Sequence, residues 1–279
     1  HLLVGIGRMD RRHFLQAMAA GAACMQAPGL HAAQKPLDDA SIKDYLFKIR
    51  HPDMHHASDV VADERTRAIL ANVNRRLTAV REVVGFGNFN VLSFDEMLEF
   101  GRRYSQIGEF TRAELDLLES LFYEDASRYG FYGEKPLGKI TQRVDLREVI
   151  KIPNTGHYVF AGKSLTLYEK VLKQVGGNLT LTSGVRSVVK QMQLFVAKAD
   201  AADGNLSLAS RSLAPPGYSF HGVGDFDVGI RGWGERNFTD DFADTDEFRK
   251  LLDLGYIDIR YPQDNHQGVR FEPWHIKVT

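Results

Sequence analysis

Cysteine is almost absent from this sequence, and its absence limits how the chain could hold a metal ion. The only cysteine among the 279 residues is Cys24, close to the N-terminus. The rest of the chain therefore offers no disulfide and no thiolate ligand. A metal in this part of the protein would have to be bound by histidine, aspartate or glutamate side chains.

An excess of charge of one sign is also absent. The sequence carries 35 Lys and Arg residues against 36 Asp and Glu residues, which gives a formal net charge of -1. A balanced charge provides no general attraction to nucleic acid or to anionic lipid. We therefore expect no nucleic-acid partner, and a small polar substrate is the simpler expectation.

No apolar run near the N-terminus is long enough to be a convincing membrane span. Instead, paired arginines in Asp10-Arg-Arg-His-Phe-Leu-Gln16 precede a short alanine-rich run, residues 17–25, and a small-residue cleavage zone at Leu30-His-Ala-Ala33. This order is typical of a twin-arginine export signal. The alternative is a surface helix of a cytoplasmic protein. We expect residues 1–33 to be a signal segment, so that the mature protein is periplasmic or otherwise exported and has no stable membrane span.

Periodicity in the remaining chain predicts an α+β protein. Residues 34–130 are expected to be helical, because apolar residues recur at spacings of three and four and two segments, residues 93–96 and 111–114, have capping-box spacing. Residues 131–279 contain short strand-like segments and separate short helices. No internal repeat and no glycine-rich phosphate loop is visible, which argues against a doubly wound nucleotide-binding fold.

Three short blocks in the second half contain the candidate functional residues. They are Ser183-Gly-Val-Arg-Ser187 with Gln191 behind it, Pro216-Gly-Tyr-Ser-Phe-His221 followed by Asp225 and Asp227, and Glu272-Pro-Trp-His275. Each block alone is a weak signal. Together, in this order, they resemble the VanY-type D-alanyl-D-alanine carboxypeptidases of the M15 zinc peptidase group. The resemblance covers roughly residues 150–279 and implies a small antiparallel sheet with flanking helices, as in hedgehog-like zinc peptidases.

The resemblance implies a zinc ion bound by His221, Asp227 and His275. Two neutral imidazoles and one carboxylate leave a fourth zinc position open for water, which is the arrangement of a catalytic site. Zinc lowers the pKa of that water towards neutrality. Glu272, which is not a ligand, is our candidate for the general base that takes the proton of the water and returns it to the leaving amine.

The spacing of Glu272 and His275 requires an irregular backbone. Residues three apart in a regular strand point to opposite faces of the sheet. Pro273 disfavours a regular strand, so we expect a bulge or bend there that lets Glu272 and His275 face one pocket. Trp274 would then face elsewhere, and core packing is its expected role.

Two aspartates, Asp225 and Asp227, are candidates for the carboxylate ligand. In the family the aspartate follows the histidine by seven residues, whereas here Asp227 follows His221 by six and Asp225 by four. Six extended residues span about 20 Å, and two ligands of one zinc lie within ~4 Å of each other, so the chain must turn between them. Glycines at positions 222 and 224 could supply the turn. Asp227 is favoured because apolar residues of a predicted strand flank it on both sides.

The same resemblance places Arg186 at the substrate. A guanidinium could neutralise the terminal carboxylate of a peptide or stabilise the oxyanion that forms when its carbonyl is attacked, and the sequence does not choose between these roles. Ser219 and Gln191 are weaker candidates for hydrogen bonds to the substrate. Together with the export signal, the resemblance implies an exported zinc carboxypeptidase that removes D-alanine from peptidoglycan stem peptides, by D,D or L,D cleavage. The alternatives are a murein endopeptidase and a non-catalytic wall-binding module.

Overall fold

Helices make up the first part of the chain in the computed structural model, which describes residues 39–279. The predicted signal segment and Cys24 lie outside the described residues. The helices are α2 (Asp39–Arg50), α3 (Glu64–Val84), α4 (Phe86–Phe89), α5 (Phe94–Arg103), α6 (Arg112–Tyr123) and the 3-10 helix η1 (Ala126–Tyr129). Both predicted capping boxes are present, at the starts of α5 and α6. Helix α3 buries the side chains that recur at helical spacing, Leu70, Val73, Leu77 and Val80.

The second part of the chain alternates short strands with helices. Its elements in order are η2 (Leu146–Glu148), β1 (Val149–Ile152), β2 (His157–Phe160), α7 (Lys163–Val175), β3 (Leu179–Ser183), α8 (Val188–Ala201), α9 (Leu206–Ser212), η3 (Phe220–Gly222), β4 (Phe226–Ile230), η4 (Gly234–Phe238), η5 (Asp240–Asp244), α10 (Asp246–Asp253), β5 (Asp258–Ile259) and β6 (His275–Lys277). Strands β1 and β2 pair with each other, and the other four form an antiparallel sheet in the order β3-β4-β6-β5. The predicted α+β class with small antiparallel sheets is confirmed.

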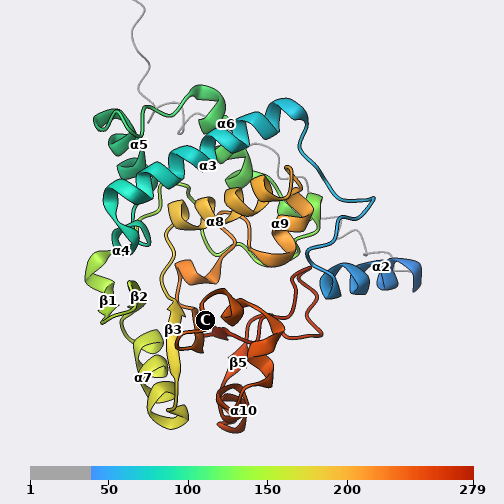
Figure 1. The fold of residues 1–279 in the computed structure, drawn as a ribbon, viewed down its shortest axis with the longest axis vertical. Coiled ribbons are helices and arrows are strands. Elements are labelled where there is room, and N and C mark those ends of the chain that lie inside the picture. Colours follow the sequence, from blue (N-terminus) through green and yellow to red (C-terminus); the bar gives the residue numbers. More distant parts are fainter. Residues whose placement is uncertain (1–38) are drawn as a thin grey trace, which may run out of the picture. The chain divides into compact units, whose positions relative to one another are not determined.

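Two hydrophobic clusters hold these elements together. In the first, α3 packs against α6 and α8, as Figure 1 shows, so that helix α8 of the second part is buried against helices of the first. The second lies between the four-stranded sheet and helices α7 and α10. Residues 41–279 form one compact unit, and the core packs across residue 130. No helix within residues 39–279 is long and apolar enough to cross a bilayer.

Candidate metal centre

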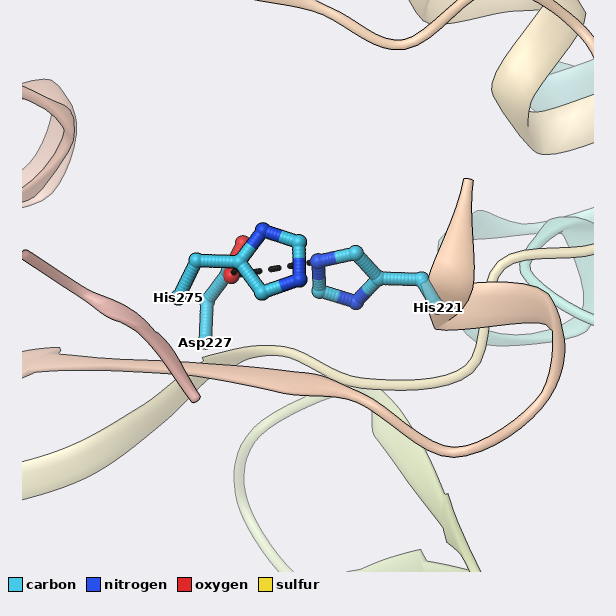
Figure 2. Close-up of side chains that lie close together, drawn as sticks. All are labelled: His221, Asp227 and His275. Carbon is cyan, nitrogen blue, oxygen red and sulfur yellow. Dashed lines mark ion pairs between the residues drawn. The ribbon is translucent and has the colours of Figure 1, made fainter. Parts of the chain in front are cut away.

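Three buried side chains converge from separate elements of the second half. His221 comes from η3, Asp227 from β4 and His275 from β6, and their polar ends point toward one another in Figure 2. One ligand atom from each lies within 4.8 Å of the other two. The sheet itself brings two of the three residues together, because Asp227 and His275 are paired in the β4–β6 register. Among residues 39–279 this is the one group of three or more His, Cys, Asp or Glu side chains placed to hold a metal ion.

A tight turn brings His221 to the strand that bears Asp227. The backbone at Gly224 has a φ of 154°, a value that residues with a Cβ rarely adopt. Gly222 serves a different purpose, since a Cβ there would lie 2.9 Å from Leu137 Cδ1. The turn predicted between His221 and Asp227 is therefore present, although only Gly224 supplies the unusual backbone angle.

Asp225 lies behind His275 rather than in the cluster of ligand atoms. Its Oδ2 is 2.9 Å from His275 Nε2, and it also accepts hydrogen bonds from Arg260 Nε at 2.7 Å and Arg260 Nη2 at 3.0 Å. The backbone N–H of Val278 donates to Oδ1 at 2.9 Å. The two neighbouring aspartates thus have separate positions: Asp227 faces the two histidines, and Asp225 fixes one of them from the far side.

The hydrogen-bond partners indicate which histidine nitrogens can face a metal. His221 Nδ1 is 2.8 Å from Gly184 O, and because a carbonyl can only accept, Nδ1 carries the hydrogen and Nε2 presents a lone pair. Nε2 lies 3.1 Å from Asp227 Oδ1, yet both atoms are buried without a hydrogen-bond partner. Nearby, His275 directs Nε2 at Asp225 and leaves Nδ1 3.9 Å from Asp227 Oδ1. Two imidazole nitrogens and one carboxylate oxygen therefore form a donor set that suits zinc.

Neighbouring charges keep the carboxylate of this donor set ionised. Burial raises the pKa of Asp227, but the charges of His221 and Arg186 lower it by more, to about 2. Arg186 Nη2 donates to Asp227 Oδ2 at 2.7 Å, and Arg186 Nε donates to Ser183 Oγ at 2.8 Å. Asp227 thus presents one oxygen to the histidines and the other to Arg186. Burial lowers the pKa of His221, because burial disfavours the charged form of the imidazole.

Glu272 reaches the same centre because the backbone bends before β6. The N–H of His275 donates to Glu272 O at 3.1 Å, which closes a turn around Pro273. Glu272 Oε2 then lies 3.0 Å from His275 Nδ1. The predicted bend is confirmed, and Trp274 packs as predicted in the sheet core, with its ring 5.9 Å from that of Phe238.

A cleft of about 390 Å³ opens beside the centre, and the other predicted site residues line it. Gln191 Nε2 donates to Ala214 O at 2.6 Å, while its Oε1 is buried without a partner. Ser219 Oγ accepts the N–H of His221 at 3.3 Å and caps η3, so Ser219 has a structural role at the histidine. Arg186 is also on the cleft wall but is already paired with Asp227.

Several residues that shape the site gave no usable sequence signal. Arg260 lies in a segment that the sequence showed only as strand-like, yet it anchors Asp225. Phe86 and Lys190 line the cleft, and Phe86 belongs to the helical first part, for which the sequence predicted no role at the site. Gly184 could have been noticed within its block: a Cβ there would lie 1.8 Å from Tyr158 O, and its own carbonyl orients His221.

Both the sequence and the fold of the chain resemble those of known proteins. The family model described as VanY, D-alanyl-D-alanine carboxypeptidase, matches residues 161–278, a range that contains all the candidate site residues. No curated protein matches the chain. Similar solved structures include the LdcB LD-carboxypeptidase, with 23% identity over 48% of this chain and 69% of that one and a TM-score of 0.39.

Two further solved structures are similar over nearly the same share of this chain. One is a mutant of the vancomycin resistance D,D-pentapeptidase VanY in complex with Zn(II), with 23% identity over 47% of this chain and 78% of that one and a TM-score of 0.35. The other is VanYB in complex with D-alanine-D-alanine, with 25% identity over 47% of this chain and 76% of that one and a TM-score of 0.36. These structural likenesses are distant, and the match to the family model is the stronger finding.

Proposed function

We propose that the chain is an exported zinc carboxypeptidase that acts on peptidoglycan stem peptides, because residues 161–278 match the family model described as VanY, D-alanyl-D-alanine carboxypeptidase. Its reaction would be removal of a C-terminal D-alanine, by D,D or L,D cleavage. The observation that supports it most directly is the buried donor set of His221, Asp227 and His275 with Glu272 beside it. Export by the twin-arginine route is proposed from residues 10–33 of the sequence alone.

The donor set would hold zinc through His221 Nε2, Asp227 Oδ1 and His275 Nδ1. Zinc in such a site supplies Lewis-acid chemistry and makes water a usable nucleophile near neutral pH. Three protein ligands rather than four are the number found in catalytic zinc sites. Contacts behind the ligands favour this use, because Gly184 O and Asp225 each hold the histidine nitrogen that is not offered to the metal.

Glu272 is the proposed general base and then the general acid. Its carboxylate lies within hydrogen-bond reach of the cluster and lines the cleft that would admit a peptide. It can take a proton from the attacking water and return it to the departing amine. A module that only binds the wall would have no use for a carboxylate in this position, which favours an enzyme over a binding module.

Arg186 and Gln191 are the proposed contacts to the substrate. Arg186 uses Nε and Nη2 within the protein, so the remaining Nη1 would serve the substrate and stabilise developing negative charge on the carbonyl oxygen. Gln191 keeps its Oε1 free of protein partners and can accept a hydrogen bond from a peptide N–H. Ser219 is proposed to act with them while holding η3 in place.

The test is to incubate the zinc-loaded full chain with muropeptides that bear tri-, tetra- and pentapeptides and to measure product masses. Loss of one alanine from the penta- or tetrapeptide is expected, and which of the two reacts decides between D,D and L,D cleavage. The Glu272→Gln protein should bind zinc and be inactive. Cleavage of cross-linked dimers alone would indicate an endopeptidase, and unchanged masses with retained binding would indicate a binding module.

A further inference from the structure

Lys190 is a buried cation without an anionic partner, located at the cleft. It lies in the first turn of α8, is 7% exposed and lines the cleft beside Arg186. Among residues 39–279 no oxygen accepts a hydrogen bond from its ammonium group, and its nearest recorded contacts are the rings of Phe86 and Phe89, with centroids 5.3 Å and 5.8 Å away. Lysine is among the residues least often buried unless it is paired.

Three features of this position disfavour a positive charge. Burial, and then the charges of Arg186 and Arg81, lower the pKa of Lys190 to about 8. The start of a helix carries a partial positive charge that repels a cation, and α8 has no acidic residue in its first turn. Contact with two aromatic faces offsets only part of this cost. We therefore expect a cation at this position to have an anionic ligand. Its buried charge would lower the free energy of unfolding in exchange for binding that ligand.

Two other cations line the cleft, but each has a contact within the protein: Lys198 is paired with Asp53, and Arg270 lies over the ring of Trp274. Arg186 is committed to Asp227 and Ser183 through two of its nitrogens. His157, on the same wall, is neutral at physiological pH because burial, and then the charges of Arg186 and Lys190, lower its pKa to about 4. Apart from histidines, the charged residues that line the cleft are four cations (Arg186, Lys190, Lys198 and Arg270) and three carboxylates (Asp227, Glu235 and Glu272), which leaves a net positive charge.

A peptide cleaved at its last bond carries one anion at a fixed place, because its terminal carboxylate lies one residue, roughly 3.5 Å of chain, beyond the scissile carbonyl. We propose that Lys190 binds this terminal carboxylate, with Phe86 closing the cleft over the leaving residue. The inference rests on the proposed carboxypeptidase function and adds the residue that restricts cleavage to the end of a chain. It also gives the helical first part of the protein a role at the site, since Phe86 belongs to it.

The test compares a stem peptide ending in free D-alanine with the same peptide ending in D-alanine amide. For Lys190→Met, kcat/KM on the free acid should fall roughly 10- to 100-fold, the worth of a charged hydrogen bond, mainly through a higher KM. Cleavage of the amide, a poor substrate of the wild type, should not change. The matched control is Lys173→Met, which removes an exposed lysine of α7 and should behave as the wild type.

A charge-restoring variant separates loss of the ammonium group from damage to the fold. Because Cys24 is the only cysteine, Lys190→Cys in a Cys24→Ser full chain offers a single thiol. Aminoethylation of that thiol rebuilds a lysine-like side chain and should restore the preference for the free acid, whereas methylthiolation should not. The melting temperature of Lys190→Met should equal or exceed that of the wild type, because an unfavourable buried charge has been removed.

Two outcomes would overturn the inference, and they differ from failure of the proposed function. If Lys190→Met keeps the wild-type ratio of kcat/KM on the free acid to kcat/KM on the amide, or loses both activities equally, Lys190 does not bind the terminal carboxylate. If the wild type cleaves neither peptide, the proposed function has failed. Binding of the acid and amide peptides to Glu272→Gln, with and without Lys190→Met, then tests the lysine alone, and equal binding of the two peptides would overturn it.

Discussion

His275 and Asp225 form a buried hydrogen bond of 2.9 Å between the imidazole Nε2 and the carboxylate Oδ2. Arg260 and the backbone of Val278 hold Asp225 in turn. The bond orients the ring so that Nε2 faces Asp225, while Nδ1 lies 3.9 Å from Asp227 Oδ1 and 3.0 Å from Glu272 Oε2. A partner of this kind tunes a metal ligand without touching the metal. Although only two positions apart in sequence, Asp225 and Asp227 would thus act on opposite sides of one histidine.

Substitution of the two aspartates should therefore give unequal losses of zinc affinity. We expect Asp227→Ala to abolish stoichiometric zinc binding, because it removes a ligand. Asp225→Asn keeps a group that can accept from Nε2 but loses the charge, and its zinc affinity should fall about 10- to 100-fold. Competition with a chromogenic chelator measures both. Zinc binding that survives Asp227→Ala and is lost in Asp225→Asn would reverse the assignment.

Sequence alone predicted the three residues that the structure brings together, but not the contacts that support them. His221 and His275 could be found because each lies in a block with recognisable neighbours, and Asp227 because Phe226 and Val228 mark a strand. The pairing of Arg186 with Asp227 depends on where β3 and β4 align in the sheet, with Ser183 opposite Asp227, and no local pattern encodes that register. The same holds for Arg260, whose partner lies 35 residues away.

The helical first part shows the other limit of sequence reasoning. Its helices were predictable from local signals, since α5 and α6 begin with capping boxes and α3 follows an apolar periodicity. The contribution of this part to the cleft could not be predicted, because Phe86 reaches His157 and Lys190 only through the packing of α3 and α4 near α8. Tertiary proximity of this kind leaves no trace in the spacing of residues along the chain.

Arg186→Lys should separate the two roles that the sequence left open for this residue. The structure pairs Arg186 with Asp227 at 2.7 Å, which places its guanidinium next to a proposed zinc ligand. Stabilisation of an oxyanion is therefore the expected role, and loss of one such donor lowers kcat about 10²- to 10³-fold. Steady-state kinetics on the free-acid peptide should show this fall in kcat with little change in KM. A raised KM with unchanged kcat would instead indicate binding of the terminal carboxylate.

Gly184→Ala should disrupt the site through the backbone. A Cβ at Gly184 would lie 1.8 Å from Tyr158 O, the carbonyl that accepts the N–H of Val185 at 2.7 Å. The backbone at Gly184 and at Tyr158 must move apart to admit the added methyl group. This shift moves the Gly184 carbonyl, which orients His221. Thermal unfolding should show a lower melting temperature, and chelator competition should show weaker zinc binding. Gly138→Ala, where no atom lies within 4 Å of the added Cβ, is the matched control and should change neither.

The ion pair between Asp59 and Arg211 should make the stability of the protein depend on pH in acid. Arg211 Nη1 lies 2.7 Å from Asp59 Oδ1, and both side chains are buried. Burial raises the pKa of Asp59, but hydrogen bonds from Arg211 and Asn205 lower it by more, from 3.8 to about 2. A carboxyl with a lowered folded-state pKa contributes stability above its unfolded pKa of 3.8, and this contribution is lost as the pH falls through about 2.

Asp59→Asn tests this pair, because it leaves the Arg211 charge buried without a counter-charge. Urea unfolding at pH 7 should show a loss of about 3–5 kcal/mol relative to the wild type. At pH 3 the difference in unfolding free energy between the wild type and Asp59→Asn should be smaller by about 1 kcal/mol. The reason is that Asp59 of the unfolded wild type is already protonated at this pH, which offsets part of the stability that the carboxylate contributes. Asp53→Asn, which removes the exposed partner of Lys198, should cost less than about 1 kcal/mol at either pH. A gap for Asp59→Asn that is equal at both pH values would show that the ionised carboxylate is not what stabilises this contact.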